Sequence, residues 1–266
     1  MDMANKTDRA SAGAALAGCL AGRIVLVTGG AVRIGRAIAL ALAEAGADVV
    51  VHARCSLTEA DALVTELRGL GRRAWQVSGD LETPAGAAGV FTASVAAAGR
   101  LDGLVNNAAI FTRRPLARCE EADFEASWRI NALAPMLLTR LLAEHVVGRC
   151  GNAAAPVAGV VNLLDQRIAR PAAGCIPYLV SKQALAAFTQ AAALELAPQI
   201  TVNAVAPGAV LAAVTTDGRE PGGPVPLGRR ATPEQVAAAV VFLLASPAIT
   251  GQILYVDGGQ HLGGGQ

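Results

Sequence analysis

The chain has 266 residues, of which 53% are hydrophobic and only 3% aromatic, and 22 basic side chains nearly balance 21 acidic ones. This length fits one large α/β domain better than two small ones, and the apolar content is too high for a disordered chain. A net charge of +1 argues against a nucleic-acid partner, which would need a basic face. Five cysteines without a Cys-x-x-Cys pair disfavour zinc and disulfide frameworks and fit reduced thiols in a cytoplasmic protein.

The N-terminus and one internal stretch are expected to lie outside the packed core. Residues 1–20 combine charges with an Ala-rich run and lack the form of a secretory signal, so we expect a flexible extension before a domain over residues 21–266. The Gly- and Pro-rich stretch 217–226 is expected to belong to a flap over residues 212–226. No apolar run reaches the roughly 18 residues that a membrane-spanning helix needs, so no membrane association is expected.

Short β-branched runs alternate with Ala- and Leu-rich stretches from Arg23 onward. The pattern predicts strands at 24–28, 48–52, 74–78, 103–106, 158–164, 201–206 and 252–256. It predicts helices at 34–45, 58–70, 87–98, 122–147, 178–196 and 233–245, the fourth bent or divided near Pro135. This alternation indicates an α/β single-domain Rossmann fold, with a doubly wound, seven-stranded parallel sheet and helices on both faces. Periodicity does not give the strand order.

The first strand runs directly into a glycine-rich turn, Thr28-Gly-Gly-Ala-Val-Arg-Ile-Gly35, and then into a helix. Glycines let the backbone approach a pyrophosphate, and the helix N-terminus supplies free N–H groups and partial positive charge. Because a strand precedes the turn and a helix follows it, a dinucleotide site is favoured over a plain turn. We expect the cofactor contacts here to be Gly29, Arg33, Ile34 and Gly35.

The tip of the second strand, residues 52–56, has no acid that would bind the ribose 2′-hydroxyl of NADH. Arg54, with Arg33 nearby, can pair with the 2′-phosphate of NADPH. The alternative is that Arg54 only solvates the strand end. After the third strand, Asp80 is placed to meet the adenine amino group. We predict NADPH as the cofactor, and this part of its site comprises His52, Arg54, Ser56, Asp80 and Leu81.

Tyr178 and Lys182 are four residues apart on a predicted helix, so they share a face. A tyrosine with a pKa of about 10 is a poor acid at neutral pH. An ammonium at roughly 5 Å, with an effective dielectric constant near 20, favours the phenolate by about 3 kcal/mol and lowers the tyrosine pKa by about two. The Tyr-x-x-x-Lys pattern alone is common on helix surfaces, so the interpretation depends on its setting.

Other polar and glycine residues fall at the carboxyl ends of predicted strands, where open α/β sheets bind ligands. Asn107-Ala108-Ala109 follows the fourth strand, where the cofactor should cross the sheet. Asp165 ends the fifth strand, and Pro207-Gly208 ends the sixth. Asn131 lies inside the long predicted helix, where an amide can interrupt backbone bonding and order a water. All of these groups are expected to face one rim.

With these residues in place, nearly all of residues 22–264 resembles a short-chain dehydrogenase/reductase. The resemblance rests on the turn from Thr28 to Gly35, Asp80, Asn107-Ala-Ala109, Asn131, Tyr178-x-x-x-Lys182, Pro207-Gly208 and the closing Val256-Asp-Gly-Gly259. It implies that Tyr178 donates a proton, that Lys182 binds the nicotinamide ribose and depresses the tyrosine pKa, and that Asn131 holds a proton-relay water. It also implies a homotetramer.

Two positions depart from most members of that family. Arg33 stands in place of a glycine, and Asp165 stands in place of the serine that hydrogen-bonds a substrate carbonyl. Both departures, and Phe111 after the Asn-Ala turn, are similar to pteridine reductases, which reduce dihydropterins and folates with NADPH. That subgroup implies a pterin stacked on Phe111, although ordinary core packing is the alternative for this ring. The implied substrate contacts are Arg33, Phe111, Asp165 and Tyr178.

The sequence thus leaves three functions to distinguish. The first is NADPH-dependent reduction of a dihydropterin or dihydrofolate, in which Asp165 hydrogen-bonds Tyr178 and passes it a proton. The second is a short-chain carbonyl reductase acting on a ketone. The third is a non-catalytic cofactor-binding sensor, against which the joint presence of Asn131, Tyr178 and Lys182 speaks. The expected partner is a small molecule, and no residues show the spacing of metal ligands.

Overall fold

The computed structural model describes residues 18–151, 153–210 and 225–263. Its strands form one parallel sheet in the order β3-β2-β1-β4-β5-β6-β7. The winding reverses at β1, which pairs with β2 on one side and β4 on the other, so the predicted doubly wound fold is confirmed. The strands are β1 (Ile24–Val27), β2 (Asp48–Ala53), β3 (Ala74–Ser78), β4 (Gly103–Asn106), β5 (Ala158–Leu163), β6 (Ile200–Pro207) and β7 (Ile253–Val256).

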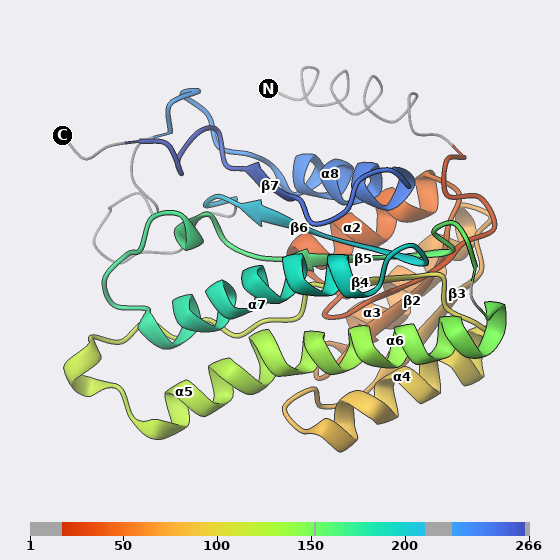
Figure 1. Cartoon of the computed structure of the whole chain (residues 1–266), viewed down its shortest axis with the longest axis horizontal. Coiled ribbons are helices and arrows are strands. Elements are labelled where there is room, and N and C mark those ends of the chain that lie inside the picture. The colour runs from red at the N-terminus through yellow and green to blue at the C-terminus, as the bar shows by residue number, and fades with distance from the viewer. Residues whose placement is uncertain (1–17, 152, 211–224, 264–266) are drawn as a thin grey trace.

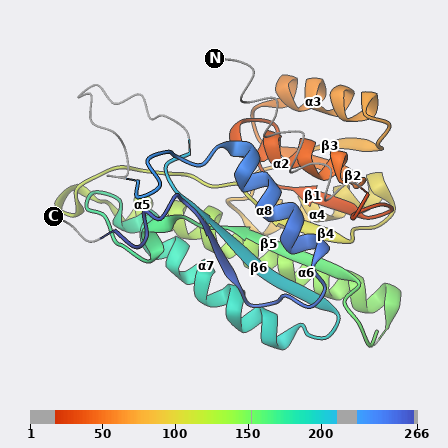
Figure 2. The ribbon, with the colours of Figure 1, turned by 90° about the horizontal axis from the view of Figure 1, so that it is seen from above.

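Helices cover both faces of the sheet (Figures 1 and 2). They are α2 (Arg33–Glu44), α3 (Leu57–Gly69), α4 (Pro84–Ala98), α5 (Glu121–Trp128), α6 (Ala134–Cys150), α7 (Ile176–Glu195) and α8 (Pro233–Ala245), with short helical turns η1 (Leu116–Arg118), η2 (Arg129–Leu133) and η3 (Gln166–Ile168). The predicted helices all occur. The start of α4 lies three residues before its predicted start because the Thr83 hydroxyl caps it, accepting from the N–H of Gly86 at 3.0 Å.

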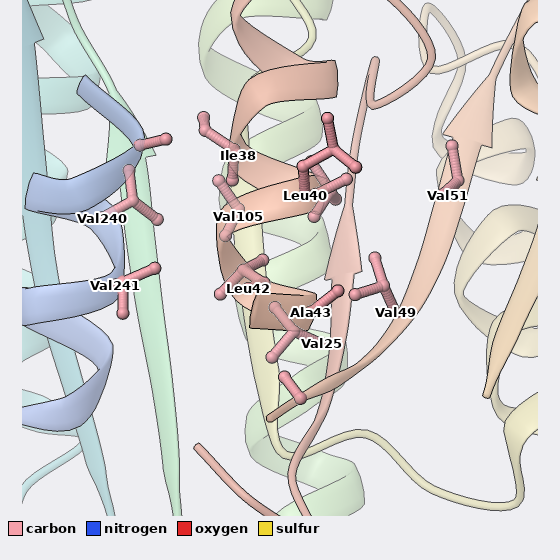
Figure 3. Close-up of a cluster of buried hydrophobic side chains, with 14 of the residues drawn as sticks. Val25, Ile38, Leu40, Leu42, Ala43, Val49, Val51, Val105, Val240 and Val241 are labelled. Atoms are coloured by element: carbon pink, nitrogen blue, oxygen red, sulfur yellow. The ribbon is translucent and has the colours of Figure 1, made fainter. Parts of the chain in front are cut away.

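Two apolar cores follow from the alternation of side chains along the strands. Val25 and Val27 of β1 join α2, α3 and α8 on one face, and Figure 3 shows Ile38 of α2 and Val240 of α8 on facing sides of this cluster. Ile24 and Leu26 join α4, α6 and α7 on the other face. Because both faces are covered, the strands are apolar on both sides, and the carboxyl ends of the strands are the open edge that can hold a site.

The long predicted helix is divided near Pro135, as the sequence indicates. A π-helical turn, η2, separates α5 from α6, and the N–H of Ala134 bonds to the carbonyl of Arg129. Pro135 has no N–H to donate to the carbonyl of Asn131, four residues earlier, so the α-helical pattern fails at that point. Over Glu121–Cys150 the helical stretch is long and apolar enough to span a membrane, and half of its most apolar window is buried inside the fold.

The packed structure begins slightly before residue 21. Leu20 is fully buried, and its N–H bonds to the carbonyl of Ala45 at 2.9 Å. Residues 1–17 of the expected extension and residues 211–224 of the expected flap lie outside the described residues.

Candidate functional site

A cavity of about 430 Å³ opens at the carboxyl ends of the central strands. Most of the predicted site residues line it: Gly29, Arg33, Ile34, Gly35, His52, Arg54, Asp80, Leu81, Asn107, Ala108, Ala109, Phe111, Tyr178, Lys182 and Pro207. The sequence did not indicate Val32, Ile110, Ile130, Leu163 and Leu164, which complete the wall. The structure thus brings these segments together around one cavity.

The glycine-rich turn is held closed by Asn107. The Asn107 side-chain amide donates to the carbonyl oxygens of Thr28 and Gly29, each at 2.9 Å. Gly29 has a φ of +59°, which glycine adopts freely. A Cβ on Gly35 would lie 2.1 Å from the Gly29 carbonyl oxygen. Both glycines are therefore required by the backbone, and the turn presents the N-terminus of α2 to the cavity.

His52 fixes the same turn from the second strand. Its Nδ1 accepts from the N–H of Gly29 at 3.2 Å, and its Nε2 donates to the carbonyl of Gly79 at 3.1 Å. Burial lowers the pKa of His52, so the ring stays neutral in the tautomer that these two bonds require. The sequence predicts a cofactor contact for His52; the structure adds that both ring nitrogens are used to position Gly29 and Gly79.

At the tip of β2, Arg54 lies 3.5 Å from a carboxylate oxygen of Asp80. Both side chains are about half exposed, so this ion pair contributes at most about 1 kcal/mol to stability, and an incoming phosphate could replace Asp80 as the partner of the guanidinium.

The prediction for Ser56 is not supported, because Ser56 does not line the cavity and occupies the N-cap position of α3. Its carbonyl accepts the N–H of Ala60 instead.

Arg33 has a φ of +55° in the first turn of α2, a conformation that costs a non-glycine residue about 1 kcal/mol or more. Its side chain is exposed and lines the cavity. The structure thus supports a phosphate or substrate contact for Arg33.

Arg33→Gly should separate the backbone strain at this position from the contribution of the arginine side chain to cofactor binding. We expect the free energy of unfolding to rise by about 0.5–1 kcal/mol, because the backbone strain disappears. The dissociation constant for NADPH should rise roughly fivefold to tenfold, because a cation near the phosphates is lost. Urea unfolding and fluorescence titration measure the two quantities. Tighter NADPH binding by the variant would contradict a role for Arg33 at the cofactor.

Tyr178 donates its hydroxyl hydrogen to Asp165 Oδ2 at 3.0 Å. Burial raises the pKa of Tyr178 well above 10, and the charge and hydrogen bond of Asp165 add to this rise, while Arg167 acts against it. The expectation that Lys182 alone brings the tyrosine pKa down is therefore wrong for the free site. Tyr178 is held as a neutral phenol, which is the form that can donate a proton.

Lys182 is 2% exposed, and its ammonium donates to the carbonyl of Leu163 at 2.6 Å. Its Nζ lies 5.9 Å from the centre of the Tyr178 ring. Burial lowers the pKa of Lys182 from 10.5 to about 8, and the charge of Asp165 opposes this shift. Lys182 therefore titrates within reach of ordinary assay conditions.

This lowered pKa predicts a pH-dependent affinity for NADPH. Below about pH 8 Lys182 is charged and attracts the anionic dinucleotide, and above that value the free protein loses the charge. We expect the dissociation constant to be flat below this pH and to rise by up to about tenfold per pH unit above it. Lys182→Met should bind more weakly and show no such rise. A flat wild-type profile up to about pH 9.5 would contradict this assignment.

The lowered pKa of Lys182 also determines how this residue's contribution to the free energy of unfolding changes with pH. The lysine pKa is lower in the folded protein than in the unfolded chain, so the unfolded chain binds more protons between about pH 8 and 10.5. Its contribution to the free energy of unfolding therefore rises with pH across that window.

Phe111 meets Tyr178 edge to face, with ring centres 4.8 Å apart and planes at 85°. The Phe111 ring is 52% exposed, so the core-packing alternative does not describe it. Arg167, which sequence reasoning missed, places its guanidinium 5.6 Å from the Phe111 ring centre and donates to Asp165 Oδ2 at 2.9 Å. A flat ligand could stack against the exposed part of the Phe111 ring beside Tyr178.

Asp165 and Asn131, both predicted site residues, are not among the residues that line the cavity. Asp165 acts through Tyr178 and is covered by Arg167, with 14% of its side chain exposed. Asn131 is fully buried, and its amide accepts from the N–H of Ile110 and donates to the carbonyl of Ile110 and the hydroxyl of Ser181. With both its amide hydrogens used, the side chain of Asn131 positions the segment after β4 against α7.

Gly208 also lies outside the cavity. A Cβ on Gly208 would lie 2.4 Å from the Gln260 side-chain oxygen and 2.9 Å from Asp257. The close approach of Gln260 and Asp257 requires a glycine at position 208, whereas Pro207 before it lines the cavity.

Among the described residues, no three His, Cys, Asp or Glu side chains are arranged to hold a metal ion.

Known proteins share this architecture along nearly the whole chain. Residues 29–261 match the family model described as Enoyl-(Acyl carrier protein) reductase. An uncharacterised oxidoreductase of Mycobacterium tuberculosis is 37% identical over 251 residues, which cover 89% of this chain and 91% of that protein. The 3-oxoacyl-[acyl-carrier-protein] reductase FabG of Aggregatibacter actinomycetemcomitans is 34% identical, covering 88% and 98%.

Two solved structures are similar in fold and sequence. The FolM alternative dihydrofolate reductase 1 from Brucella canis, complexed with NADP, superposes with a TM-score of 0.83 at 31% identity, covering 93% of this chain and 98% of that one. Acetoin dehydrogenase from Enterobacter cloacae superposes with a TM-score of 0.82 at 32% identity, covering 92% and 97%. The proteins similar to this chain thus include one named as a dihydrofolate reductase, one as a 3-oxoacyl-[acyl-carrier-protein] reductase and one as an acetoin dehydrogenase.

Proposed function

The chain belongs to the short-chain dehydrogenase/reductase family and is an oxidoreductase, and within that family we propose that it reduces a C=N bond of a dihydropterin or dihydrofolate with NADPH. The observation that carries the proposal is the hydrogen bond from Tyr178 to Asp165 beside the exposed ring of Phe111. The similarity to a FolM dihydrofolate reductase supports the same substrate class.

A carboxylate at position 165 suits a C=N substrate better than a ketone. Hydride transfer to a ketone builds negative charge on oxygen, and a serine hydroxyl can donate to it. An ionised carboxylate only accepts hydrogen bonds and repels that charge. A pterin ring instead offers N–H donors and becomes more basic at the nitrogen that takes the proton, so Asp165 next to Tyr178 would favour it.

The residues present fit NADPH. The turn closed by Asn107 leaves α2 N–H groups facing the cavity, where a pyrophosphate binds. Arg33 and Arg54 line the same cavity and can face a 2′-phosphate. When bound, NADPH supplies the hydride. In the balanced reaction, ring carbon gains this hydride, ring nitrogen gains one proton, and NADP⁺ is released.

The chain's own residues handle the proton. Tyr178 gives the hydrogen of its hydroxyl to the ring nitrogen, and the resulting phenolate is stabilised by Lys182, 5.9 Å from its ring. A proton taken up by Asp165 from solvent can then return to Tyr178 across their 3.0 Å hydrogen bond. Phe111 holds the flat substrate ring beside the hydroxyl.

Asp165→Ser tests which bond the site reduces. We expect the wild type to have the higher kcat/KM for a dihydropterin, and the variant to lose roughly tenfold to hundredfold on it. Activity on ketones such as acetoin should rise in the variant, because the negative charge of Asp165, which disfavours a developing oxyanion, is removed. NADPH absorbance follows both reactions. Wild-type turnover of ketones alone would favour the carbonyl-reductase alternative, and no turnover would favour a sensor.

We also propose a cytoplasmic homotetramer. Exposed apolar side chains on α5, α7, α8 and β7 support burial between subunits, and they include Trp128, Leu194, Phe242 and Leu254. Light scattering tests the assembly, since a tetramer has four times the mass of the 26.8 kDa chain.

The proposed cytoplasmic location is supported by the cysteines among the described residues, which are unpaired, as in proteins of a reducing compartment.

A further inference from the structure

The two segments that frame the Phe111 end of the cavity are strongly basic, although the whole chain is nearly neutral. Residues 107–119 and 164–177 contain five arginines and one acid, Asp165. The N–H of Arg114 bonds to the carbonyl of Gly174 at 2.8 Å, which joins the two segments. In Figure 1 the segment between β5 and α7 and the segment leading to α5 lie at the same end of the molecule. Their combined positive field would attract an anionic group to this end.

Three of these arginines, Arg113, Arg167 and Arg170, form what we call the arginine rim. Arg113 runs along Gly174, with its Nε 4.0 Å from where a Cβ would stand on that glycine. A guanidinium nitrogen of Arg170 lies 3.3 Å from the corresponding position on Gly263. Within the described ranges, neither Arg113 nor Arg170 forms an ion pair with an acid. Arg114, by contrast, is paired with Asp123 at 2.8 Å.

The rim reaches the reacting end of the cavity through Arg167. Its guanidinium lies over Phe111 and shares Asp165 with Tyr178. Both Arg113 and Arg167 favour the thiolate of Cys175, which lies three residues before Tyr178, although burial raises the pKa of that thiol overall. The positive field therefore extends from the outer rim to the start of α7, beside the place where a substrate ring would stack.

We propose that the arginine rim binds the carboxylates of an anionic tail, and hence that the substrate is a dihydrofolate with its glutamyl tail and not a bare dihydropterin. The substrate assignment rests on the proposed C=N reduction, whereas the tail site rests on its own residues. In a dihydrofolate, the aminobenzoyl spacer carries the carboxylates beyond the ring. With the ring on Phe111 beside Arg167, the carboxylates lie farther out, where Arg113 and Arg170 can meet them, and planar guanidinium groups match carboxylates bidentately.

Kinetics with Arg113→Gln test the tail site. We expect KM for dihydrofolate to rise roughly fivefold to tenfold, as for loss of one partly exposed charge-assisted contact, and KM for 7,8-dihydropterin to stay within about twofold. Added salt should raise the wild-type KM for dihydrofolate only. Arg140→Gln is the matched control, because Arg140 pairs with Glu144 on α6 and belongs to neither basic segment. Equal responses of both substrates, or no response, would overturn the tail site.

Calorimetry with p-aminobenzoylglutamate, the tail without its pterin, separates this proposal from the proposed function. We expect it to bind the protein–NADPH complex and to bind several-fold more weakly to Arg113→Gln. If the fragment binds in this way and no dihydropterin or dihydrofolate is reduced, the reduction fails and the tail site stands. If the fragment does not bind, the tail site is overturned whether or not a dihydropterin is reduced.

Discussion

Replacing Tyr178 with phenylalanine should lower kcat for substrate reduction by about 10²- to 10⁴-fold, the usual contribution of a positioned proton donor. The variant keeps the aromatic ring beside Phe111 and loses only the hydroxyl that donates to Asp165. Asp165 keeps its ion pair with Arg167, so the fold should survive. Because the hydroxyl acts in the transition state, kcat and kcat/KM should fall together, while the dissociation constant for NADPH stays within about threefold.

Tyr255→Phe is the matched control, since Tyr255 is the only other tyrosine in the chain. It stacks on His261 with ring centres 4.0 Å apart and does not line the cavity. We expect its kcat to equal that of the wild type. Reductase activity that survives in Tyr178→Phe at the wild-type rate would refute the role of Tyr178 as proton donor.

Gly35→Ala should abolish NADPH binding. The added Cβ would stand 2.1 Å from the Gly29 carbonyl oxygen and 2.7 Å from the Asn107 amide nitrogen, so the turn itself must move. We expect the dissociation constant to rise at least about 100-fold, or about 2.8 kcal/mol, and the free energy of unfolding to fall by about 1–3 kcal/mol. Fluorescence titration and urea unfolding measure these effects.

Gly89→Ala provides the control for the same substitution. Gly89 lies inside α4 and is exposed, and a Cβ there would meet nothing within 4 Å. This variant should be more stable by about 0.5–1 kcal/mol, because alanine favours a helix over glycine. Its affinity for NADPH should not change. Wild-type NADPH affinity in Gly35→Ala would show that the turn does not hold the cofactor.

The fold was largely predictable because both periodicities are strong in this sequence. Buried runs such as residues 24–27 mark strands covered on both faces, and Pro233–Ala245 matches its predicted bounds. The break in the long helix near Pro135 was predictable because a proline cannot donate to the carbonyl four residues earlier, whereas the π-helical form of the break was not. The strand order depends on crossovers, which local periodicity does not encode.

The site was predictable wherever function depends on a residue's place at a strand end. Tyr178, Lys182, Phe111 and Arg33 all line the cavity as expected. Arg167 was missed because its role depends on contacts with Phe111 and Asp165, from which no motif spacing could be read. The pKa of Tyr178 was predicted in the wrong direction, because the sequence shows the nearby lysine but not the burial of the phenol.

The most direct test of C=N reduction follows the hydride itself. The protein would be given NADPH deuterated at the transferable position, together with 7,8-dihydrofolate and acetoin in one mixture, and the products would be analysed by mass spectrometry and NMR. We predict one deuterium on the ring carbon of tetrahydrofolate, next to the nitrogen that gains the proton. Deuterium on the carbinol carbon of the reduced ketone, with the dihydrofolate unchanged, would contradict the proposed function and identify a carbonyl reductase.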